Sequence, residues 1–489
     1  MKKNIKNFLT FFLILISIVI ILASIFYRKN FKEQDFETLF FNMVYGVKNA
    51  NTTIVWVGIR ENIINIFILL FLFYVPIFII YILNKKNLKI IKINSLIYAN
   101  IILIFAIIFG LSKIEFFEYL KNQNTTSNIF EENYSNQGTK ITFPKKKRNL
   151  IYIFSESMET SLISAKEGGC WEWTIIPELA QLEKENINFS NTEKLGGALT
   201  SRETTCTTAG MVAQTSGVPL KMMLGKNYYG EAKTFLPGVY ALGDILKDEG
   251  YNLEVMFGSD ASFGGRKWYF EKHGDYKIFD LNTAIEEGKM TEEDKVWWGF
   301  DDDHLFEWAK DEINNLAFQD KPFNFIMLTA DTHFIDGYLS PNAEKKYDSQ
   351  YENVFAYSSK NITKFIEWIK EQAFYENTTI VLVGDHLGMQ SQFYKENIKD
   401  KEYTRTVYNV FINSAIPEEN SKNRRFSTLD IFPTVLASMG AKIEGERLGL
   451  GTNLFSGKKT LIEEMGYDEY NKEVAKKSNY YNKYLLNNN

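Results

Sequence analysis

Two stretches of the chain, NLIYIFSES at residues 149–157 and TTIVLVGDH at residues 378–386, decide the fold that the sequence predicts. In each of them, an apolar run long enough for one strand leads directly into acidic or imidazole side chains. Unbroken apolar runs are typical of parallel strands, because helices cover both faces of a parallel sheet. Three similar runs, at residues 252–258, 323–329 and 406–412, alternate with helical patterns at residues 238–250 and 351–373. We therefore expect an α/β fold with a doubly wound, mostly parallel sheet.

The residues that follow these strands predict a metal site. The carboxyl ends of parallel strands lie at one edge of the sheet, where doubly wound proteins bind ligands. Glu156 follows the first strand, and Asp385 and His386 follow the strand at 378–384. Carboxylate oxygens and imidazole nitrogens suit one shared divalent cation. A single acid after a strand is equally typical of a solvated turn, whereas the Gly-Asp-His-x-Gly pattern at 384–388 is more specific.

A hydroxyl-rich stretch between these strands is a candidate for a nucleophile. Residues 196–220 read GGALTSRETTCTTAGMVAQTSGVPL, and a helix is predicted over residues 205–216, ended by Gly217 and Pro219. A threonine at the start of a helix is first of all an N-cap. The same place also suits a nucleophile, because the amides and dipole of a helix N-terminus favour a phosphate. A metal ion bound to the hydroxyl would lower the hydroxyl pKa.

The N-terminal quarter has the pattern of membrane-spanning helices. Three long uncharged runs occur at residues 8–27, 66–83 and 93–112, and about 20 apolar residues suffice to cross a bilayer. Lysines precede the first run and fill the loop after the second, at positions 2, 3, 6, 85, 86, 89 and 92. Because lysines mark the cytoplasmic side, we expect a multi-pass protein of the cytoplasmic membrane. Residues beyond Lys113 would then lie outside the cytoplasm.

Composition divides the remaining chain and excludes some functions. We expect a linker at residues 113–148, from its composition, and a polar C-terminal tail at 456–489; the bounds of a catalytic domain between them, 149–455, are what the resemblance of its motifs to a known family implies. The net charge of −5 over 489 residues excludes a nucleic-acid binder that relies on a global basic surface. The two cysteines, Cys170 and Cys206, form no CxxC pair, which excludes a cysteine zinc module. A disulfide between them is left open by the sequence.

Four segments in chain order resemble the membrane phosphoglycerol transferases and lipoteichoic acid synthases of the alkaline phosphatase/sulfatase superfamily. These segments are NLIYIFSESMET (149–160), TTCTTAGMVAQTSGVPL (204–220), LTADTHFIDGY (328–338) and IVLVGDHLG (380–388). The resemblance implies that Glu156, Thr204, Asp385 and His386 hold one divalent cation. Mn²⁺ is the expected ion, with Mg²⁺ or Zn²⁺ as alternatives.

The resemblance also assigns roles around the metal. Thr204 would be the nucleophile, because its distance to Gly217 fits the family without a gap; Thr200, in a similar setting, remains an alternative. His333 would protonate or orient a substrate oxygen. Arg266 lies in SDASFGGRKWYFEKHG (259–274), which resembles a segment that binds the substrate phosphate. Asp302, in WGFDD (298–302), would be a structural or substrate-pocket acid.

The function implied is a metal-dependent phosphoglycerol transferase anchored in the membrane. By resemblance, phosphatidylglycerol is the donor, and an envelope glycan or glycerophosphate polymer is the acceptor. The Cys-x-Pro-Ser-Arg pattern of sulfatases is absent around Cys206, which makes sulfate-ester hydrolysis an unfavourable interpretation. A phosphoethanolamine transferase or a phosphodiesterase on the same fold is the alternative. A non-catalytic membrane receptor for lipid or wall polymer is the alternative from another class.

Overall fold

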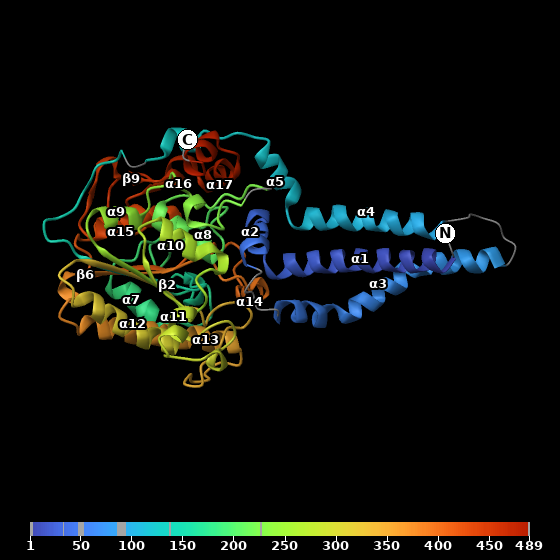
Figure 1. Ribbon diagram of the computed structural model, residues 1–489, viewed down its shortest axis with the longest axis horizontal. Helices are drawn as coiled ribbons and strands as arrows, with labels where there is room; N and C mark the ends of the chain where they lie inside the picture. The colour runs from blue at the N-terminus through green and yellow to red at the C-terminus, as the bar shows by residue number, and fades with distance from the viewer. Residues whose placement is uncertain are drawn as a thin grey trace. The chain divides into compact units, whose positions relative to one another are not determined.

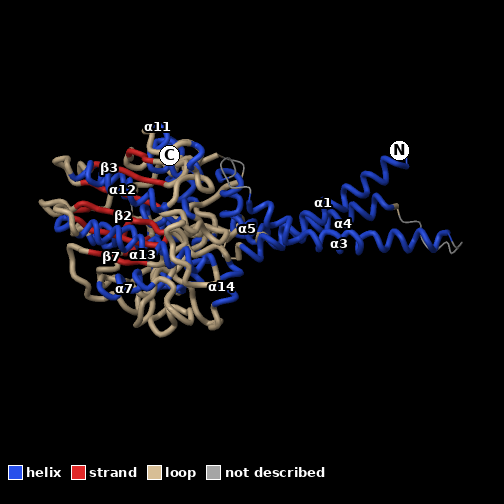
Figure 2. Tube along the Cα trace, turned by 90° about the horizontal axis from the view of Figure 1, so that it is seen from below, coloured by secondary structure: helices blue, strands red, loops and turns tan. Residues whose placement is uncertain are grey.

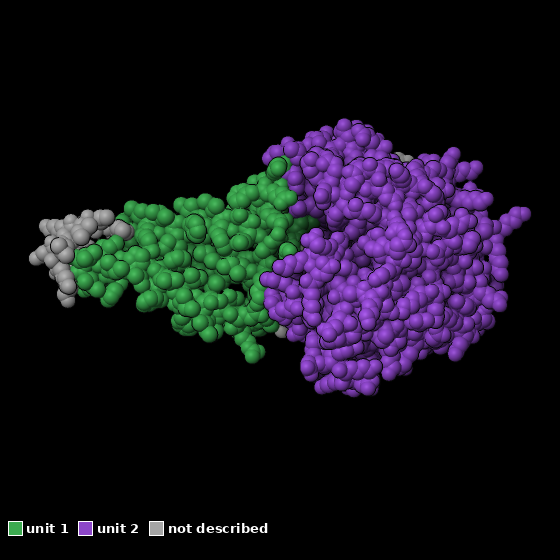
Figure 3. Space-filling view, turned by 180° about the vertical axis from the view of Figure 1, so that it is seen from behind, with its two compact units in different colours: residues 1–36, 51–121 green, residues 37–50, 122–489 purple. Residues whose placement is uncertain are grey.

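The computed structural model describes residues 3–32, 34–46, 53–85, 94–135, 138–224 and 227–487. The chain divides into two compact units (Figure 3). The first comprises Met1–Phe36 and Asn51–Lys121, and the second comprises Glu37–Ala50 and Asn122–Asn489. The predicted linker and tail, residues 113–148 and 456–489, therefore do not coincide with the boundaries of the two units.

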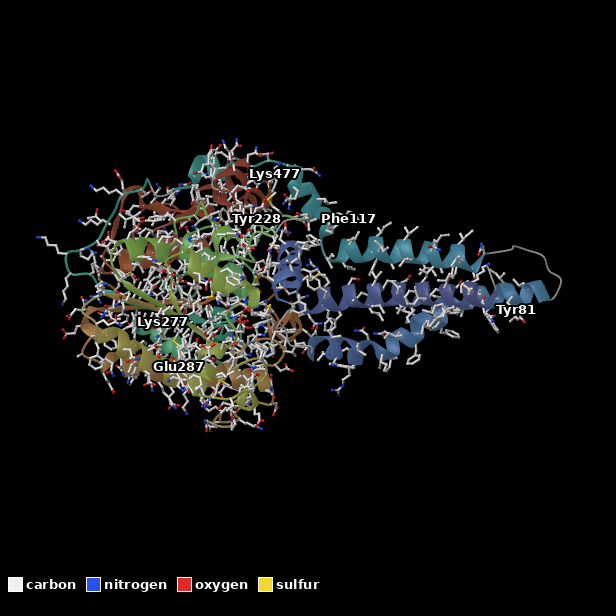
Figure 4. All side chains as sticks on the ribbon, viewed as in Figure 1. Tyr81, Phe117, Tyr228, Lys277, Glu287 and Lys477 are labelled. Atoms are coloured by element: carbon white, nitrogen blue, oxygen red, sulfur yellow. The ribbon has the colours of Figure 1, made fainter. Side chains whose placement is uncertain are left out.

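The first unit contains three helices long and apolar enough to cross a membrane: Asn4–Asn30, Val55–Leu83 and Ser95–Lys113. They belong to α1 (Lys3–Asn30), α3 (Thr53–Lys85) and α4 (Ser95–Lys113). Side chains along these helices are mostly hydrocarbon, with Tyr81 near the end of α3 (Figure 4). The prediction of three apolar N-terminal helices is confirmed. The cluster of lysines that predicts orientation lies largely outside the described residues, at positions 2, 86, 89 and 92.

A six-stranded sheet with the order β4–β3–β5–β2–β6–β7 lies at the centre of the second unit (Figure 2). Its strands are β2 (Asn149–Ser155), β3 (Asn252–Phe257), β4 (Lys277–Phe279), β5 (Phe323–Leu328), β6 (Thr378–Gly384) and β7 (Asn409–Ile412). Neighbouring strands are parallel except β7, which is antiparallel to β6. The predicted α/β fold with a mostly parallel sheet is confirmed. The short strand β4 was not predicted, because its three residues are too few for a periodic signal.

Helices cover both faces of this sheet (Figure 1). Leu150, Tyr152 and Phe154 of β2 belong to a core shared with α8 (Thr207–Ser216), α9 (Leu242–Asp248), α10 (Arg266–Lys272) and α15 (Ile431–Ser438). Ile151 and Ile153 belong to a core shared with α7 (Pro177–Glu185), α12 (Asp302–Ala317) and α13 (Gln350–Lys370). Because successive side chains of a strand alternate between its faces, a run that is apolar throughout serves both cores.

The segments expected as linker and tail contain secondary structure. The linker includes α5 (Phe116–Gln123), α6 (Ile129–Asn133) and β1 (Ile141–Thr142), which pairs with β8 (Lys442–Ile443). The C-terminal residues form α16 (Leu461–Met465), α17 (Tyr467–Ala475) and η10 (Tyr481–Leu485). Apolar side chains spaced among many charges, such as Tyr470, Val474 and Tyr481, are buried there. The average polarity of residues 456–489 hides this pattern of buried side chains, which is why the sequence predicts a polar tail there.

The remaining helices and strands are short. They are α2 (Phe36–Phe41), η1 (Asn42–Gly46), η3 (Thr160–Leu162), η4 (Ala232–Thr234), η5 (Phe263–Gly265), α11 (Leu281–Glu286), η6 (Glu292–Asp294), η7 (Tyr375–Asn377), α14 (Ser391–Asn397), η8 (Thr428–Asp430), η9 (Glu444–Glu446), β9 (Arg447–Leu448) and β10 (Gly451–Thr452). Of these, α2 and η1 precede the second apolar helix in the chain, yet η1 belongs to the unit that contains the sheet.

The packing of the C-terminal segment gives a first prediction. The Tyr481 side chain is fully buried, and its hydroxyl donates to the carbonyl of Pro219 at 2.8 Å. We expect Tyr481→Ala to lower the free energy of unfolding by roughly 3–5 kcal/mol, the usual cost of truncating a buried aromatic residue. Thermal unfolding of the full-length protein in detergent would measure the change. Tyr484→Ala is the matched control, since Tyr484 is 42% exposed; an equal effect of both would contradict this packing.

Candidate active site

Glu156, Asp385 and His386 meet at the carboxyl ends of two neighbouring strands. Ser155 of β2 is paired in register with Gly384 of β6, so the next residue of each strand enters the same space. Ligand atoms of all three side chains lie within 4.8 Å of one another, and all three residues are buried. The structure therefore brings together the three charged residues that the sequence proposes for a metal ion.

The arrangement of these atoms fits a divalent cation. Oδ2 of Asp385 is a buried oxygen without a hydrogen-bond partner among the described residues. Nδ1 of His386 donates to the carbonyl of Leu387 at 2.8 Å, which leaves Nε2 as the ligand nitrogen. Nε2 lies 3.4 Å from Oδ2 of Asp385 and 3.5 Å from Oε1 of Glu156. Two carboxylate oxygens and one imidazole nitrogen are a donor set suited to Mn²⁺, Mg²⁺ or Zn²⁺.

The electrostatics of the cluster also favour a bound cation. Burial raises the pKa of Asp385 to about 8, and the charge of Glu156 adds to that effect. Burial acts in the same direction on Glu156, but His386 and His333 outweigh it and hold the pKa of Glu156 below its ordinary value. Against the opposing effect of burial, Asp385 and Glu156 raise the pKa of His386. Binding of a cation here at neutral pH would therefore displace a proton from Asp385.

Backbone groups and one buried ion pair hold the ligands in place. Oδ1 of Asp385 accepts from the amides of Ser157 and His386, each at 2.8 Å. Ser157 has φ 56°, a left-handed conformation that turns its amide toward Asp385. Glu159 accepts from the amide of Gly388 at 2.9 Å and from Nε of Arg405 at 2.9 Å. These bonds tie the loop after β2 to the loop after β6.

Two hydroxyls reach the Glu156 carboxylate: Ser157, in the same loop, donates to Oε1 at 2.8 Å, and Thr207 approaches from the start of a helix. Oγ1 of Thr207 donates to Oε2 of Glu156 at 3.2 Å and lies 3.4 Å from Nε2 of His386. Thr207 is the first residue of α8, whose N-cap is Cys206. The helix can approach so closely because residue 210 is glycine: a Cβ there would lie 2.1 Å from the carbonyl oxygen of Asp385. Gln214, one turn further on, donates to the carbonyl oxygens of Gly384 and Asp385 at 2.9 and 3.2 Å.

Thr204, the nucleophile expected from the sequence, is engaged in its own turn. Its Oγ1 donates to the carbonyl of Ser201 at 2.8 Å and accepts from the Ser201 amide at 3.1 Å. The alternative residue, Thr200, lies in the same loop, where its carbonyl accepts from Tyr467 at 2.8 Å. The helix was expected to begin at Thr205 but begins at Thr207. Four of the five residues from 204 to 208 are threonine, so residue type could not identify which one faces the metal site.

His333 and Arg266 lie close enough to interact electrostatically with the cluster. His333 follows β5; burial lowers its pKa against the attraction of Glu156. Nδ1 of His333 donates to the carbonyl of Phe334 at 2.8 Å. The rings of Trp298 and His333 pack edge to face, with their centroids 4.6 Å apart. Arg266 is buried, and its guanidinium carbon lies 4.6 Å from the centroid of the Phe257 ring. Burial lowers its pKa to about 10, which leaves it cationic at neutral pH, and Glu156 is the largest opposing influence.

Asp302 holds the loop that carries His333. Its two carboxylate oxygens accept from the amides of Ala330 and Asp331 at 2.7 and 3.2 Å, and its own amide donates to Asp331 at 3.2 Å. Burial and the neighbouring acids Asp301 and Asp303 raise the pKa of Asp302 to about 7. These contacts support the structural alternative of the sequence-based prediction.

The two cysteines are separate buried thiols in this structure, so the disulfide that the sequence left open is not formed. Cys206 is the residue before Thr207 and precedes the first turn of α8.

Known proteins resemble this chain in sequence and fold. The profile of the family described as Sulfatase matches residues 148–441. Phosphoglycerol transferase I of Escherichia coli is 32% identical over 325 residues, which are 65% of this chain and 40% of that protein. The chain thus spans less than half the length of these relatives.

Two solved structures share the fold at a TM-score of 0.50. The lipoteichoic acid synthase LtaP of Listeria monocytogenes is 18% identical, with 67% of this chain and 81% of that one covered. The lipooligosaccharide phosphoethanolamine transferase A of Neisseria meningitidis is 13% identical, with 87% and 83% covered.

Fold and site together define an α/β protein in which a buried Glu-Asp-His cluster that could hold a metal ion faces the N-terminus of a helix. The family profile covers more than half of the chain. The chain belongs to the sulfatase family, in the alkaline phosphatase superfamily, as the sequence motifs predict.

The metal site gives a second prediction. Asp385→Asn removes a charged ligand while keeping the size of the side chain, so we expect Mn²⁺ affinity to fall by at least about 100-fold, more than for the loss of an outer-shell partner. Isothermal titration of the full-length protein in detergent would measure it. Glu254→Gln, a change at a buried carboxylate of β3, is the control and should bind Mn²⁺ like the unmodified protein. Unchanged affinity of Asp385→Asn would refute the ligand assignment.

Proposed function

We propose that this chain is a metal-dependent phosphoglycerol transferase of the cytoplasmic membrane that acts through a covalent intermediate on Thr207. The observation that carries the proposal is the position of the Thr207 hydroxyl, in contact with Glu156 and His386 at the first residue of α8. Binding alone does not require a hydroxyl at that point, so a catalytic function is favoured over a membrane receptor. A bound divalent cation supplies Lewis-acid chemistry that lowers the pKa of the hydroxyl and offsets phosphate charge.

In the first step, Oγ1 of Thr207 attacks the phosphorus of phosphatidylglycerol. A bond forms between this oxygen and phosphorus, and the bond from phosphorus to the diacylglycerol oxygen breaks. The threonine loses its proton, the departing diacylglycerol gains one, and glycerophospho-threonine remains. The amides at the N-terminus of α8 favour the negative charge of the phosphate.

In the second step, a hydroxyl of the acceptor attacks the same phosphorus. Its proton is lost, the bond from phosphorus to Thr207 breaks, and the threonine oxygen regains a proton. The acceptor class that we propose is an envelope glycan or glycerophosphate polymer, in line with the relationship to phosphoglycerol transferase I. The three candidate membrane spans suit a donor that stays in the bilayer, and the catalytic unit is proposed to lie outside the cytoplasm.

His333 and Arg266 have complementary roles in this proposal. With Nδ1–H bonded to the Phe334 carbonyl, Nε2 of neutral His333 can accept a proton and later return it. Arg266 stays charged and can neutralise phosphate oxygens. Its Nη2 already donates to Ser259 at 2.9 Å, so the guanidinium is held in a defined place.

A phosphoethanolamine transferase is the second candidate, because the Neisseria meningitidis protein of that activity shares the fold over most of this chain. Mass spectrometry would distinguish them: incubation with phosphatidylglycerol should add glycerophosphate to Thr207, whereas modification only by phosphatidylethanolamine would favour the second candidate.

The nucleophile assignment gives a third prediction. Thr207→Ala should lower phosphoglycerol transfer by roughly 10⁴-fold or more, because loss of a nucleophile removes the covalent route. Transfer from radiolabelled phosphatidylglycerol by the full-length protein would measure it, with Mn²⁺ titration as a check that the metal site persists.

Thr204→Ala is the matched control. The Thr204 hydroxyl is bonded within its own turn, so transfer should stay within roughly tenfold of the unmodified protein, the size expected for loss of one or two neutral hydrogen bonds. The reverse pair of results would restore Thr204 as the nucleophile, and full activity of both variants would exclude a covalent threonine.

The lowered pKa of His333 gives a fourth prediction. Burial favours neutral imidazole, so His333 accepts protons above its lowered pKa and loses this capacity as the pH falls through it. At saturating Mn²⁺, we expect kcat/KM to decline on the acid side with a midpoint below pH 6.5, the ordinary pKa of histidine. His333→Gln should lower transfer by roughly 10²–10⁴-fold and abolish this decline.

His304→Gln is the control for pH, because the His304 side chain is 52% exposed and pairs with Asp301. It should keep both the activity and the acid decline. An unchanged acid decline in His333→Gln would show that another group titrates.

A further inference from the structure

A short segment between the first two apolar helices belongs to the unit that contains the active site. Its described residues are 37–46, which we call the inter-span segment; it includes most of α2 and all of η1. Only residues 31–36 separate it from Asn30, the last residue of α1. The segment lies outside residues 148–441, the part of the chain matched by the sulfatase profile.

The inter-span segment contacts the loop that leads to the nucleophile. Oγ1 of Thr38 lies 3.0 Å from Oγ1 of Thr205, a hydrogen bond between residues far apart in the chain. Glu37 is 1% exposed, and its carboxylate lies 4.0 Å from the guanidinium of Arg202. Thr205 is two residues before Thr207, so the segment holds the chain directly ahead of the reactive hydroxyl.

The same segment reaches the turn before Arg266. The ring of Phe41 would lie 3.9 Å from a Cβ on Gly264, and the ring of Phe263 would lie 3.8 Å from one on Gly46. Oγ1 of Thr208, the second residue of α8, donates to the carbonyl of Gly264 at 2.9 Å. The start of the nucleophile helix and the turn that carries Arg266 therefore share the inter-span segment as a neighbour.

Helix α17 holds the nucleophile loop through different residues. The hydroxyl of Tyr467 donates to the carbonyl of Thr200 at 2.8 Å, and Asn471 accepts from the amide of Arg202 at 3.3 Å. The loop from Thr200 to Cys206 is thus bonded both to the inter-span segment and to a C-terminal helix, and both lie outside the family match.

We propose that Thr38 is a positioning residue for catalysis, which acts through its hydrogen bond to Thr205 to set the place of the Thr207 hydroxyl. This inference rests on the proposed function, in which Thr207 is the nucleophile. The inter-span segment is therefore part of the catalytic apparatus as well as a connection between two apolar helices. Because Thr38 acts through Thr205 in this proposal, and not as a metal ligand or a reacting group, we expect its effect on the turnover step.

The test is a double-mutant cycle in the full-length protein in detergent. Thr38→Val and Thr205→Val each remove one hydroxyl of the pair at nearly constant volume, and Thr38→Ser keeps the hydroxyl. Thr10→Val is the matched control, because Thr10 is a buried threonine of α1 whose hydroxyl bonds to Lys6 and Ser95. Transfer from phosphatidylglycerol, Mn²⁺ affinity and the thermal midpoint are measured for every variant, together with Thr207→Ala.

We expect each valine variant to lower kcat roughly five- to tenfold, the size of one neutral hydrogen bond, with KM for the donor and Mn²⁺ affinity unchanged. The double variant should be no slower than either single variant, since both remove the same bond, and Thr38→Ser should restore kcat. If Thr38→Val proved unable to fold, Thr205→Val with its control would still decide the question.

Three outcomes would overturn the inference: kcat of both valine variants within twofold of the unmodified protein, effects that multiply in the double variant, or a loss of kcat matched by equal losses of thermal midpoint and Mn²⁺ affinity. Failure of the proposed function would look different. In that case Thr207→Ala would retain transfer, whatever Thr38→Val did.

Discussion

The burial of two carboxylates beside one imidazole is the constraint on which the rest of the catalytic unit depends. Glu156 and Asp385 are 2% and 0% exposed, and two carboxylates in such a place cannot both be ionised without added positive charge. The backbone amides of Ser157 and His386 donate to Oδ1 of Asp385 and so supply part of the required positive charge. These amides do not bond to the other oxygen, Oδ2, which is therefore suited to bind a cation.

The nucleophile helix is held against this charge by close approach of its backbone. Gly210 permits contact with the carbonyl of Asp385, and Gln214 bonds to the same stretch of chain. These two contacts help to fix the rotation of α8 and its position along its axis relative to the loop after β6, and the bond between Thr38 and Thr205 acts on the chain just ahead of the helix. Given both, the first helical residue, Thr207, is the one whose side chain meets Glu156. In the proposed mechanism, which threonine is reactive therefore depends on how the middle of the helix packs.

This dependence explains which features could be predicted from the sequence. The strands and the Glu156, Asp385 and His386 set are local signals, because each apolar run is followed directly by its polar residues. The predicted sheet is confirmed, and the structure brings the three residues together. Which of the neighbouring threonines faces the cluster depends on the residue at which α8 begins. The turn at residues 201–204, where Glu203 has φ 62°, precedes that start and gives no clear signal in the sequence. Thr38 and Thr205 are in contact although they lie 167 positions apart in the chain, and no local sequence pattern predicts this contact. The C-terminal helices were missed because a few buried residues lie among many charged ones.

Charge also constrains how an anionic donor can enter. Without a cation, the ionised Glu156 repels a phosphodiester, and Asp385, with its pKa of about 8, avoids the same conflict at neutral pH by holding a proton. Arg266 is positive under these conditions, since its pKa of about 10 lies above neutral pH, and Asp385 and Glu156 raise the pKa of His386 against the effect of burial. A single buried guanidinium cannot balance both the carboxylate and the incoming phosphate. In the proposed mechanism, a cation held by Glu156, Asp385 and His386 would supply the positive charge that Arg266 alone does not, and Asp385 would give up its proton to hold that cation.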